Sequence, residues 1–308
     1  MKVAIFGTGG VGGYFGGKIA NAGHDVTFIA RGEHLKAIQA NGLKVKSISG
    51  DFLIQPAEAT DDIKKIKDVE LVIIAVKAWQ VKDAAKELKT VVGKDAVVMP
   101  LQNGVSAAEE ITEELNRENV IGGLCKIISK VEAPGVIHHF GVEPTIVFGE
   151  LNKEKTARIG RLKELFDEAG INSIAADDIH AELWKKFIAI CVSGLLAVTQ
   201  STYGVVRELE ETRIMMRELV AEIYTVALRA GIDLNDDIVE KTMDFIDSFP
   251  YDSTSSLTRD VWEGKPSEIE YQNGTVVKLG RKYDVDTPVN RFVYNCILPL
   301  ELRARKRV

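Results

Sequence analysis

The chain has 308 residues, of which 45% are hydrophobic and 27% charged, a composition typical of folded globular proteins and not of disordered ones. Its net charge of −6 gives no overall basic field for nucleic acid, and no apolar run approaches the ~20 residues that span a bilayer. The three cysteines lie far apart without a CxxC pair, which indicates neither a disulfide framework nor a clustered zinc site. We therefore expect a cytoplasmic protein of two domains, with no nucleic-acid or membrane partner.

The start of the chain predicts a strand, a glycine turn, a helix and a second strand. Residues 3–6 form a continuous apolar run, as expected of a strand buried on both faces. A helical pattern follows from Val11 to Ala22 and stops at Gly23, and residues 25–30 have the composition of a strand. This succession is a βαβ unit.

The alternation continues to the middle of the chain. Two further strands and the helices that follow them are predicted in the order 71–76, 81–92, 96–101 and 106–116. Ser106 as N-cap and Glu109 three residues later predict a capping box on the last helix.

From residue 120 the long intervening helices disappear. Strand-type segments are predicted at 120–131, 136–140 and 145–148, with a turn signal at 132–135 between the first two. We expect them to extend the sheet at its edge, partly antiparallel. A helix is predicted over 154–169.

Beyond about residue 177 strand signals nearly vanish. Long helical patterns take their place, at 179–198, 205–230, 236–249, 267–283 and 288–305. The sequence therefore predicts an α/β domain over residues 1–177 and an all-α domain over residues 178–308.

The turn after the first strand has a nucleotide-binding pattern. It matches G-x-G-x-x-G in the required context, directly after a buried strand and at the start of a helix. Glycines there permit the tight turn, the approach of a pyrophosphate and close helix–strand packing, and helix N–H groups bind the phosphates. We predict dinucleotide binding by Gly7, Thr8, Gly9, Gly10, Val11 and Gly12.

The end of the second strand indicates which dinucleotide is bound. NAD-binding sites of this kind have an acidic residue there, whereas this chain has Arg31, whose guanidinium can bind a 2′-phosphate. We therefore favour NADP (NADPH) over NAD, although Glu33 lies close by. Two further loops at strand ends supply the expected cofactor contacts Lys77 and Asn103, because ligands bind at the carboxyl ends of the strands in open α/β sheets.

Reduction of a ketone by a nicotinamide needs a proton donor for the developing alkoxide. Lys186 is one candidate, at the entrance to a very apolar helix. A Ser/Thr run at 253–260, followed by residues 265–274 with Glu268, forms a second candidate segment. Helix caps and solvated helix residues remain alternatives for that segment.

Taken together, the motifs resemble the ketopantoate reductase (2-dehydropantoate 2-reductase) family over essentially the whole chain. The matching stretches are Gly7–Gly12, KAWQV at 77–81, QNG at 102–104, AELWKKF at 181–187, SSLTRD at 255–260 and PSEIEYQNG at 266–274. The resemblance implies a Rossmann dinucleotide-binding domain followed by a helical domain, with the active site in the cleft between them. It also implies NADPH-dependent reduction of 2-dehydropantoate to (R)-pantoate, a step of pantothenate and coenzyme A biosynthesis.

The resemblance assigns roles to four side chains. It makes Lys186 the proton donor and places Asn103 in contact with cofactor and substrate. It places Ser256 on the substrate, and Glu268 beside the cofactor and the substrate hydroxyl. Hydride then moves to C2 of the keto acid while the lysine protonates the oxygen.

The chain departs from the family at three positions. Well-known members have asparagines four and eight residues after the lysine, and a third about ten residues later. Here those positions are Ile190, Gly194 and the neighbourhood of Gly204. Either nearby hydroxyls substitute, or the pocket is more apolar and, at Gly194, roomier, and takes another branched 2-keto acid. The candidate hydroxyls are Ser193, Thr199 and Ser201.

Two other functions stay open. One is a non-catalytic NADPH-binding sensor on the same scaffold. The other is a β-hydroxyacid dehydrogenase, whose own glycine-rich setting we do not find here. The apolar helical domain also leaves a homodimer open.

Overall fold

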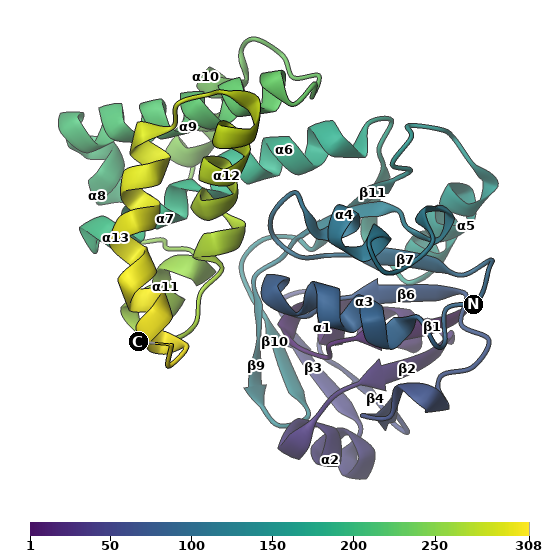
Figure 1. Ribbon diagram of the computed structural model, residues 1–308. Helices are drawn as coiled ribbons and strands as arrows, with labels where there is room; N and C mark the ends of the chain where they lie inside the picture. The colour runs from purple at the N-terminus through teal and green to yellow at the C-terminus, as the bar shows by residue number, and fades with distance from the viewer. Residues whose placement is uncertain (308) are drawn as a thin grey trace. The chain divides into compact units, whose positions relative to one another are not determined.

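The computed structural model describes residues 1–307 and divides them into two compact units (Figure 1). The first unit holds residues 1–102 and 106–179, and the second holds residues 103–105 and the chain from His180 onward. The sequence-based division at residue 177 keeps residues 103–105 in the first domain. The structure instead groups Asn103 with the helical part of the chain.

The first unit contains a parallel sheet with the strand order β5-β2-β1-β6-β7. Its strands are β1 (Lys2–Phe6), β2 (Asp25–Ile29), β5 (Glu58–Thr60), β6 (Leu71–Ile74) and β7 (Val97–Pro100). This is the order of the doubly wound Rossmann fold, in which the winding reverses between β1 and β6. The four longer strands confirm the sequence prediction to within two residues at their ends.

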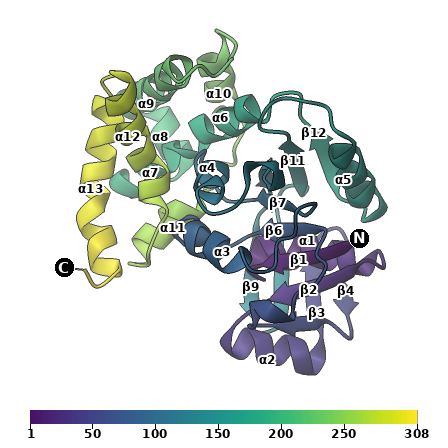
Figure 2. The ribbon, with the colours of Figure 1, turned by 45° about the vertical axis from the view of Figure 1, so that its right-hand side comes forward.

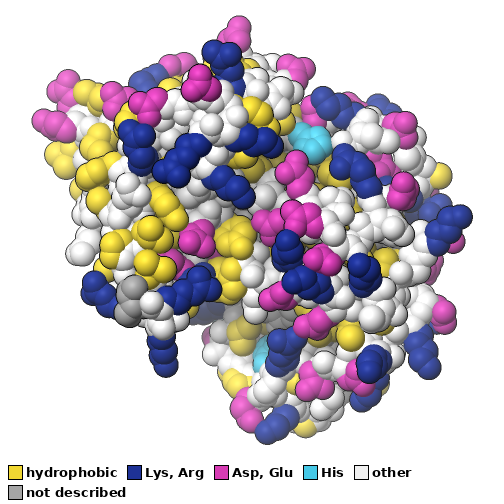
Figure 3. Space-filling view, viewed as in Figure 1, with side chains coloured by type: hydrophobic (Ala, Val, Ile, Leu, Met, Phe, Trp, Pro, Cys, Tyr) yellow, Lys and Arg dark blue, Asp and Glu magenta, His cyan; other side chains and the backbone are white. Residues whose placement is uncertain are grey.

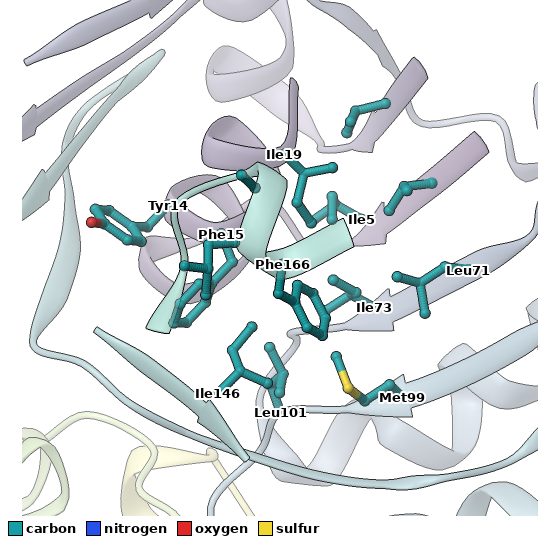
Figure 4. Packing of buried hydrophobic residues seen from close by; sticks show 14 of the residues in the cluster. Ile5, Tyr14, Phe15, Ile19, Leu71, Ile73, Met99, Leu101, Ile146 and Phe166 are labelled. Carbon is teal, nitrogen blue, oxygen red and sulfur yellow. The ribbon is translucent and has the colours of Figure 1, made fainter. Parts of the chain in front are cut away.

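Both faces of the sheet are covered, which explains why its central strands are apolar throughout. Successive side chains of β1 alternate between two cores, with Val3 and Ile5 in one and Ala4 and Phe6 in the other. The helix α1 (Gly10–Asn21) packs into the first core, as Figure 4 shows for its side chains beside Ile5. The second core is covered by α3 (Val81–Leu88) and α4 (Ala107–Thr112).

The predicted strand at 120–131 is two strands, which enter different sheets. The first, β8 (Gly122–Lys126), pairs with β11 (Thr145–Gly149), and β11 pairs in turn with β12 (Asn172–Ala175). A bridge between Val98 and Val120 places this group beside β7, as expected of an extension of the main sheet.

The second strand, β9 (Ser129–Ala133), contradicts the expected edge extension. It pairs with β10 (Val136–His139) across the predicted turn, in a separate sheet that also contains β3 (Leu43–Ser47) and β4 (Phe52–Ile54). This sheet packs on α1.

Glycines on α1 explain the close packing of that second sheet. A Cβ on Gly10 would lie 2.6 Å from the Ser129 carbonyl oxygen, and one on Gly13 would lie 2.6 Å from Ile137. On the side of the helix that faces the parallel sheet, a Cβ on Gly16 would lie 2.5 Å from Ile5 of β1. The glycine-rich start of the chain therefore serves helix packing as well as the turn.

The second unit is all-α (Figure 2). Its helices are α6 (Ile179–Ile190), α7 (Val192–Thr199), α8 (Tyr203–Glu208), α9 (Glu210–Arg229), α10 (Ile238–Asp247), α11 (Ser256–Trp262), α12 (Asn273–Tyr283) and α13 (Pro288–Ala304). The apolar α7 is buried along most of its length and contacts α8, α9, α11 and α13. The predicted helices over 179–198 and 205–230 are each broken into two, at Cys191 and Leu209.

Two helices of the first unit complete the fold, α2 (Gly32–Asn41) and α5 (Ala157–Glu168). The predicted capping box on α4 is wrong. Ser106 has φ −99° and ψ −12°, outside the extended region of a capping residue. Its hydroxyl donates to the Glu110 carboxylate at 3.0 Å instead.

Acidic and basic side chains occur side by side on both units in the face drawn in Figure 3. Within residues 1–307, no helix combines the length and the apolar character needed to cross a membrane. The same residues hold no group of three histidines, cysteines or acidic residues arranged to bind a metal ion.

Candidate active site

The glycine loop follows β1 and packs against the residues that follow β6. Gly7 has a φ of +101°, which favours glycine, and a Cβ there would lie 2.7 Å from Val76. A Cβ on Gly12 would lie 2.2 Å from the Gly7 carbonyl oxygen, so the first turn of α1 closes directly on the loop. In contrast, apart from Gly9 itself and its two chain neighbours, no heavy atom lies within 4 Å of the Cβ position of Gly9.

This open side of the loop fits a dinucleotide. Gly9 precedes the first turn of α1, where the backbone N–H groups have no intrahelical acceptor. Those groups, together with the partial positive charge of the helix end, favour a phosphate. Gly9 to Gly12 are therefore the residues that would hold the pyrophosphate.

Thr8 forms hydrogen bonds with the two elements beside the loop, β2 and α2. Its N–H and its hydroxyl both donate to the Ile29 carbonyl oxygen, at 3.1 and 3.0 Å, and its side chain is buried. Its own carbonyl oxygen lies 2.8 Å from Nε2 of His34 on α2. The position of Thr8 is thus set by β2 and α2 together.

The two predicted basic contacts lie at the carboxyl ends of β2 and β6. Arg31 directly precedes α2, is 67% exposed, and has its guanidinium 3.3 Å from Glu87 on α3. Glu33, the acidic residue nearest to it in sequence, is paired with Lys36 at 2.8 Å. Lys77 is exposed at the start of the short 3₁₀ helix that leads into α3.

A second cluster lies within the helical unit and joins three distant parts of the chain. Lys186 on α6 donates from Nζ to Asn103 Oδ1 at 2.9 Å. The amide nitrogen of Asn103 lies 3.4 Å from Glu268 Oε2, and Glu268 is buried. The carbonyl side of the amide thus faces the ammonium and its N–H side faces the carboxylate, the orientation that both charges favour.

A buried ion pair supports the segment that carries Glu268. The N–H and hydroxyl of Ser267 donate to Oε2 of Glu301 on α13, at 2.8 and 2.6 Å. Arg305 pairs with the other carboxylate oxygen and donates to the Ser267 carbonyl oxygen at 3.2 Å. Glu301 is only 2% exposed. The end of the last helix therefore positions the residue that precedes Glu268.

One interpretation of the sequence was that Gly194 makes the pocket roomier. The structure contradicts this interpretation, because other side chains fill the space. A Cβ on Gly194 would lie 2.4 Å from Asn273 Oδ1 and 2.7 Å from Val293. Asn273 is fully buried and donates to the Cys191 carbonyl oxygen at 3.2 Å. The ring of Tyr251 likewise occupies the space at Gly204, 2.3 Å from its Cβ position.

The three hydroxyls considered as substitutes for the missing asparagine amides donate hydrogen bonds to oxygen atoms within the helical unit. Ser193 donates to Gln272 Oε1 at 2.9 Å, Thr199 to the Leu195 carbonyl oxygen at 2.9 Å, and Ser201 to the Thr199 carbonyl oxygen at 3.0 Å. Each therefore already has a hydrogen-bond acceptor in the protein.

We expect that restoring a family asparagine by Gly194→Asn lowers stability rather than improving catalysis. The new side chain has to displace Asn273 and Val293 in a packed core, which costs about 1–3 kcal/mol. Urea unfolding of the wild type, of Gly194→Asn and of the exchange variant Gly194→Asn/Asn273→Gly measures the loss in free energy of unfolding. Equal stability of the wild type and Gly194→Asn would contradict the packing, and recovery in the exchange variant would support it.

The structure does not place Ser256 in the lysine–amide–carboxylate cluster. Ser256 is the exposed first residue of α11, and the preceding Ser255 caps that helix by accepting from the Thr258 N–H at 3.0 Å. Thr258 in turn donates to the Ser193 carbonyl oxygen at 2.9 Å. The Ser/Thr run therefore serves at least partly as a helix cap.

Sequence reasoning did not assign roles to His34, Asn273 or Glu301. Each acts through a partner more than 30 residues away, such as Gly135 for His34 and Ser267 for Glu301. No local motif signals such pairs. The apolar neighbours of Gly194 were the one indication that its space would be filled.

Comparison with known proteins gives a consistent assignment. The family described as ketopantoate reductase PanE/ApbA matches residues 3–153, and its C-terminal domain matches residues 178–301. A 2-dehydropantoate 2-reductase of Nostoc sp. is 31% identical over 99% of this chain and 96% of its own length.

Solved structures show the same similarity. A PanE/ApbA family ketopantoate reductase from Ralstonia eutropha JMP134 has a TM-score of 0.91 and 32% identity, covering 99% of this chain and 100% of that one. D-mandelate dehydrogenase, in a complex with NADH and anilino(oxo)acetate, shares the fold with a TM-score of 0.89 at 24% identity, over 99% of each chain.

Proposed function

We propose that this chain, which belongs to the ketopantoate reductase family, catalyses the NADPH-dependent reduction of a 2-keto acid. The proposed preferred substrate is 2-dehydropantoate. The chain is accordingly an oxidoreductase that acts on CH–OH groups. The observation that carries the proposed reaction is the cluster of Lys186, Asn103 and Glu268, because it combines a proton donor, an orienting amide and a buried carboxylate. The proposed product of this reaction is (R)-pantoate, an intermediate of pantothenate biosynthesis.

The proposed cofactor follows from the first unit. When bound, NADPH supplies the hydride. The N–H groups from Gly9 to Gly12 would hold the pyrophosphate, and Arg31 would bind the 2′-phosphate. The related fold of D-mandelate dehydrogenase holds NADH, so fold alone does not set the preference. Arg31 supports NADPH, and Glu33 does not oppose it because Glu33 is paired with Lys36.

In the proposed mechanism Lys186 does the acid catalysis. Its Nζ donates a proton to the ketone oxygen as hydride reaches C2, so that the ketone becomes a secondary alcohol and the lysine becomes neutral. Before transfer, the ammonium stabilises the negative charge that develops on that oxygen. Asn103 orients Nζ through its amide oxygen, and Glu268 fixes the amide by accepting from its nitrogen.

Arg31→Ala is expected to weaken NADPH binding about ten- to a hundredfold, because a hydrogen-bonded charge pair contributes about 1.5–3 kcal/mol. Affinity for NADH, which has no 2′-phosphate, should change little. Titration of the purified protein with each dinucleotide measures both constants. Arg161→Ala, which removes an exposed arginine on α5, is the matched control, and an equal loss for NADH and NADPH would contradict the role of Arg31.

A second candidate is the reduction of a different branched 2-keto acid. It is favoured by Ile190 and Gly194, which replace amide groups that family members use. The two candidates share the lysine mechanism and differ in the pocket alone. Comparison of kcat/KM for a panel of branched 2-keto acids separates them.

A further inference from the structure

His34 joins two segments that surround the glycine loop. Its Nε2 lies 2.8 Å from the Thr8 carbonyl oxygen, and the Gly135 N–H donates to its Nδ1 at 3.0 Å. Because Nδ1 accepts a hydrogen bond, the proton of the neutral ring is on Nε2, which donates to Thr8. One imidazole thus bridges the loop after β1 and the turn between β9 and β10.

Both ends of this bridge bear on the dinucleotide loop. Thr8 immediately precedes Gly9, the open position of the loop, and is held from its other side by Ile29 of β2. The strand that leads into the turn at Gly135 is β9, whose residue Ser129 lies against Gly10 at the start of α1. The ring therefore links Thr8 to the β9–β10 hairpin, whose residue Ser129 contacts Gly10.

The bridge requires a neutral His34 ring, and the surroundings of the ring favour that state. Partial burial lowers the pKa of His34, and the hydrogen bond to the Thr8 carbonyl opposes that shift. Both groups that bond the ring are backbone groups, and the charged side chains beside it on α2, Glu33 and Lys36, are paired with each other. A neutral imidazole, with one donor and one acceptor, matches the two partners.

We propose that His34 is a positioning residue for the dinucleotide. It holds the glycine loop in the conformation that leaves Gly9 open and directs the first N–H groups of α1 toward the pyrophosphate. The inference rests on the proposed function, which places the dinucleotide at this loop. A loop that is binding-competent for only part of the time has an affinity reduced by that fraction.

The test compares His34→Ala and His34→Gln with the wild type. Titration with NADPH gives Kd, thermal unfolding of the protein without cofactor gives Tm, and steady-state kinetics at saturating NADPH give kcat. We expect His34→Ala to raise Kd about tenfold, as for a loop that is competent about a tenth of the time. Tm, kcat and the KM of the keto acid should stay close to wild type.

Two controls make the outcome specific. His24→Ala removes a histidine of the same unit that contacts Glu168 instead of the loop, and should leave Kd unchanged. His34→Gln, which keeps a neutral donor and acceptor, should recover part of the affinity and serves if the alanine variant does not fold. Hydrogen exchange of residues 7–13 without cofactor should be faster in His34→Ala.

Unchanged Kd and unchanged exchange in His34→Ala would overturn the inference. A lower Tm with an unchanged Kd would also overturn it, because it would show a purely structural role. The proposed function fails by a different result, namely a wild-type protein that binds NADPH and reduces no 2-keto acid. That result leaves the comparison of Kd values and exchange rates intact.

Discussion

Replacement of Lys186 with alanine is expected to lower kcat about a thousandfold, in the range typical of the loss of a positioned general acid. The variant loses both the proton donor and the cation that stabilises negative charge on the ketone oxygen. Its affinity for NADPH should change little, because the dinucleotide loop lies in the other unit. Steady-state kinetics and NADPH titration of the same preparation measure both quantities.

The chain supplies a matched control for this variant. Lys185 precedes Lys186 on the same helix and is paired with Glu182 at 2.7 Å. Lys185→Ala should therefore keep nearly full activity. If Lys186→Ala retained more than about a tenth of the wild-type kcat, the lysine could not be the proton donor that the mechanism requires.

Gly9→Ala is expected to weaken NADPH binding at least about tenfold without unfolding the protein. The added methyl group meets no heavy atom within 4 Å in the protein, and Gly9 has φ −80° and ψ −161°, which alanine adopts. The added methyl group is therefore expected to interfere with the pyrophosphate, which has to approach the backbone closely at the second glycine of the motif. Replacing glycine at an N-cap changes stability by about 1 kcal/mol or less.

Gly160→Ala is the comparison for Gly9→Ala. Gly160 lies in α5 and also has open space at its Cβ position. There alanine should stabilise the helix by up to about 1 kcal/mol and leave NADPH binding unchanged. NADPH affinity equal to wild type in Gly9→Ala would contradict the placement of the pyrophosphate at this loop.

The fold was predictable from sequence where one physical signal dominated. The strands β1, β6 and β7 are buried on both faces and are therefore continuous apolar runs. Short strands such as β4, with three partly exposed residues, carry no comparable signal. The breaks at Cys191 and Leu209 were missed because the helical spacing of apolar residues continues through them.

Local and long-range features of the site also differed in how predictable they were. The glycine loop and Arg31 follow from their place after β1 and β2, because ligands bind at the ends of parallel strands. The roles proposed for Lys186 and Glu268 came from resemblance to a family. The support given by Glu301 and the packing of Asn273 on Gly194 depend on contacts between distant segments, which one sequence does not reveal.

The proposed reaction is tested most directly by the rate of NADPH oxidation by the wild-type protein with 2-dehydropantoate. The same measurement is made with other branched 2-keto acids and with NADH in place of NADPH. We predict turnover with the highest kcat/KM for 2-dehydropantoate and a clear preference for NADPH. Binding of NADPH without oxidation by any 2-keto acid would contradict this prediction.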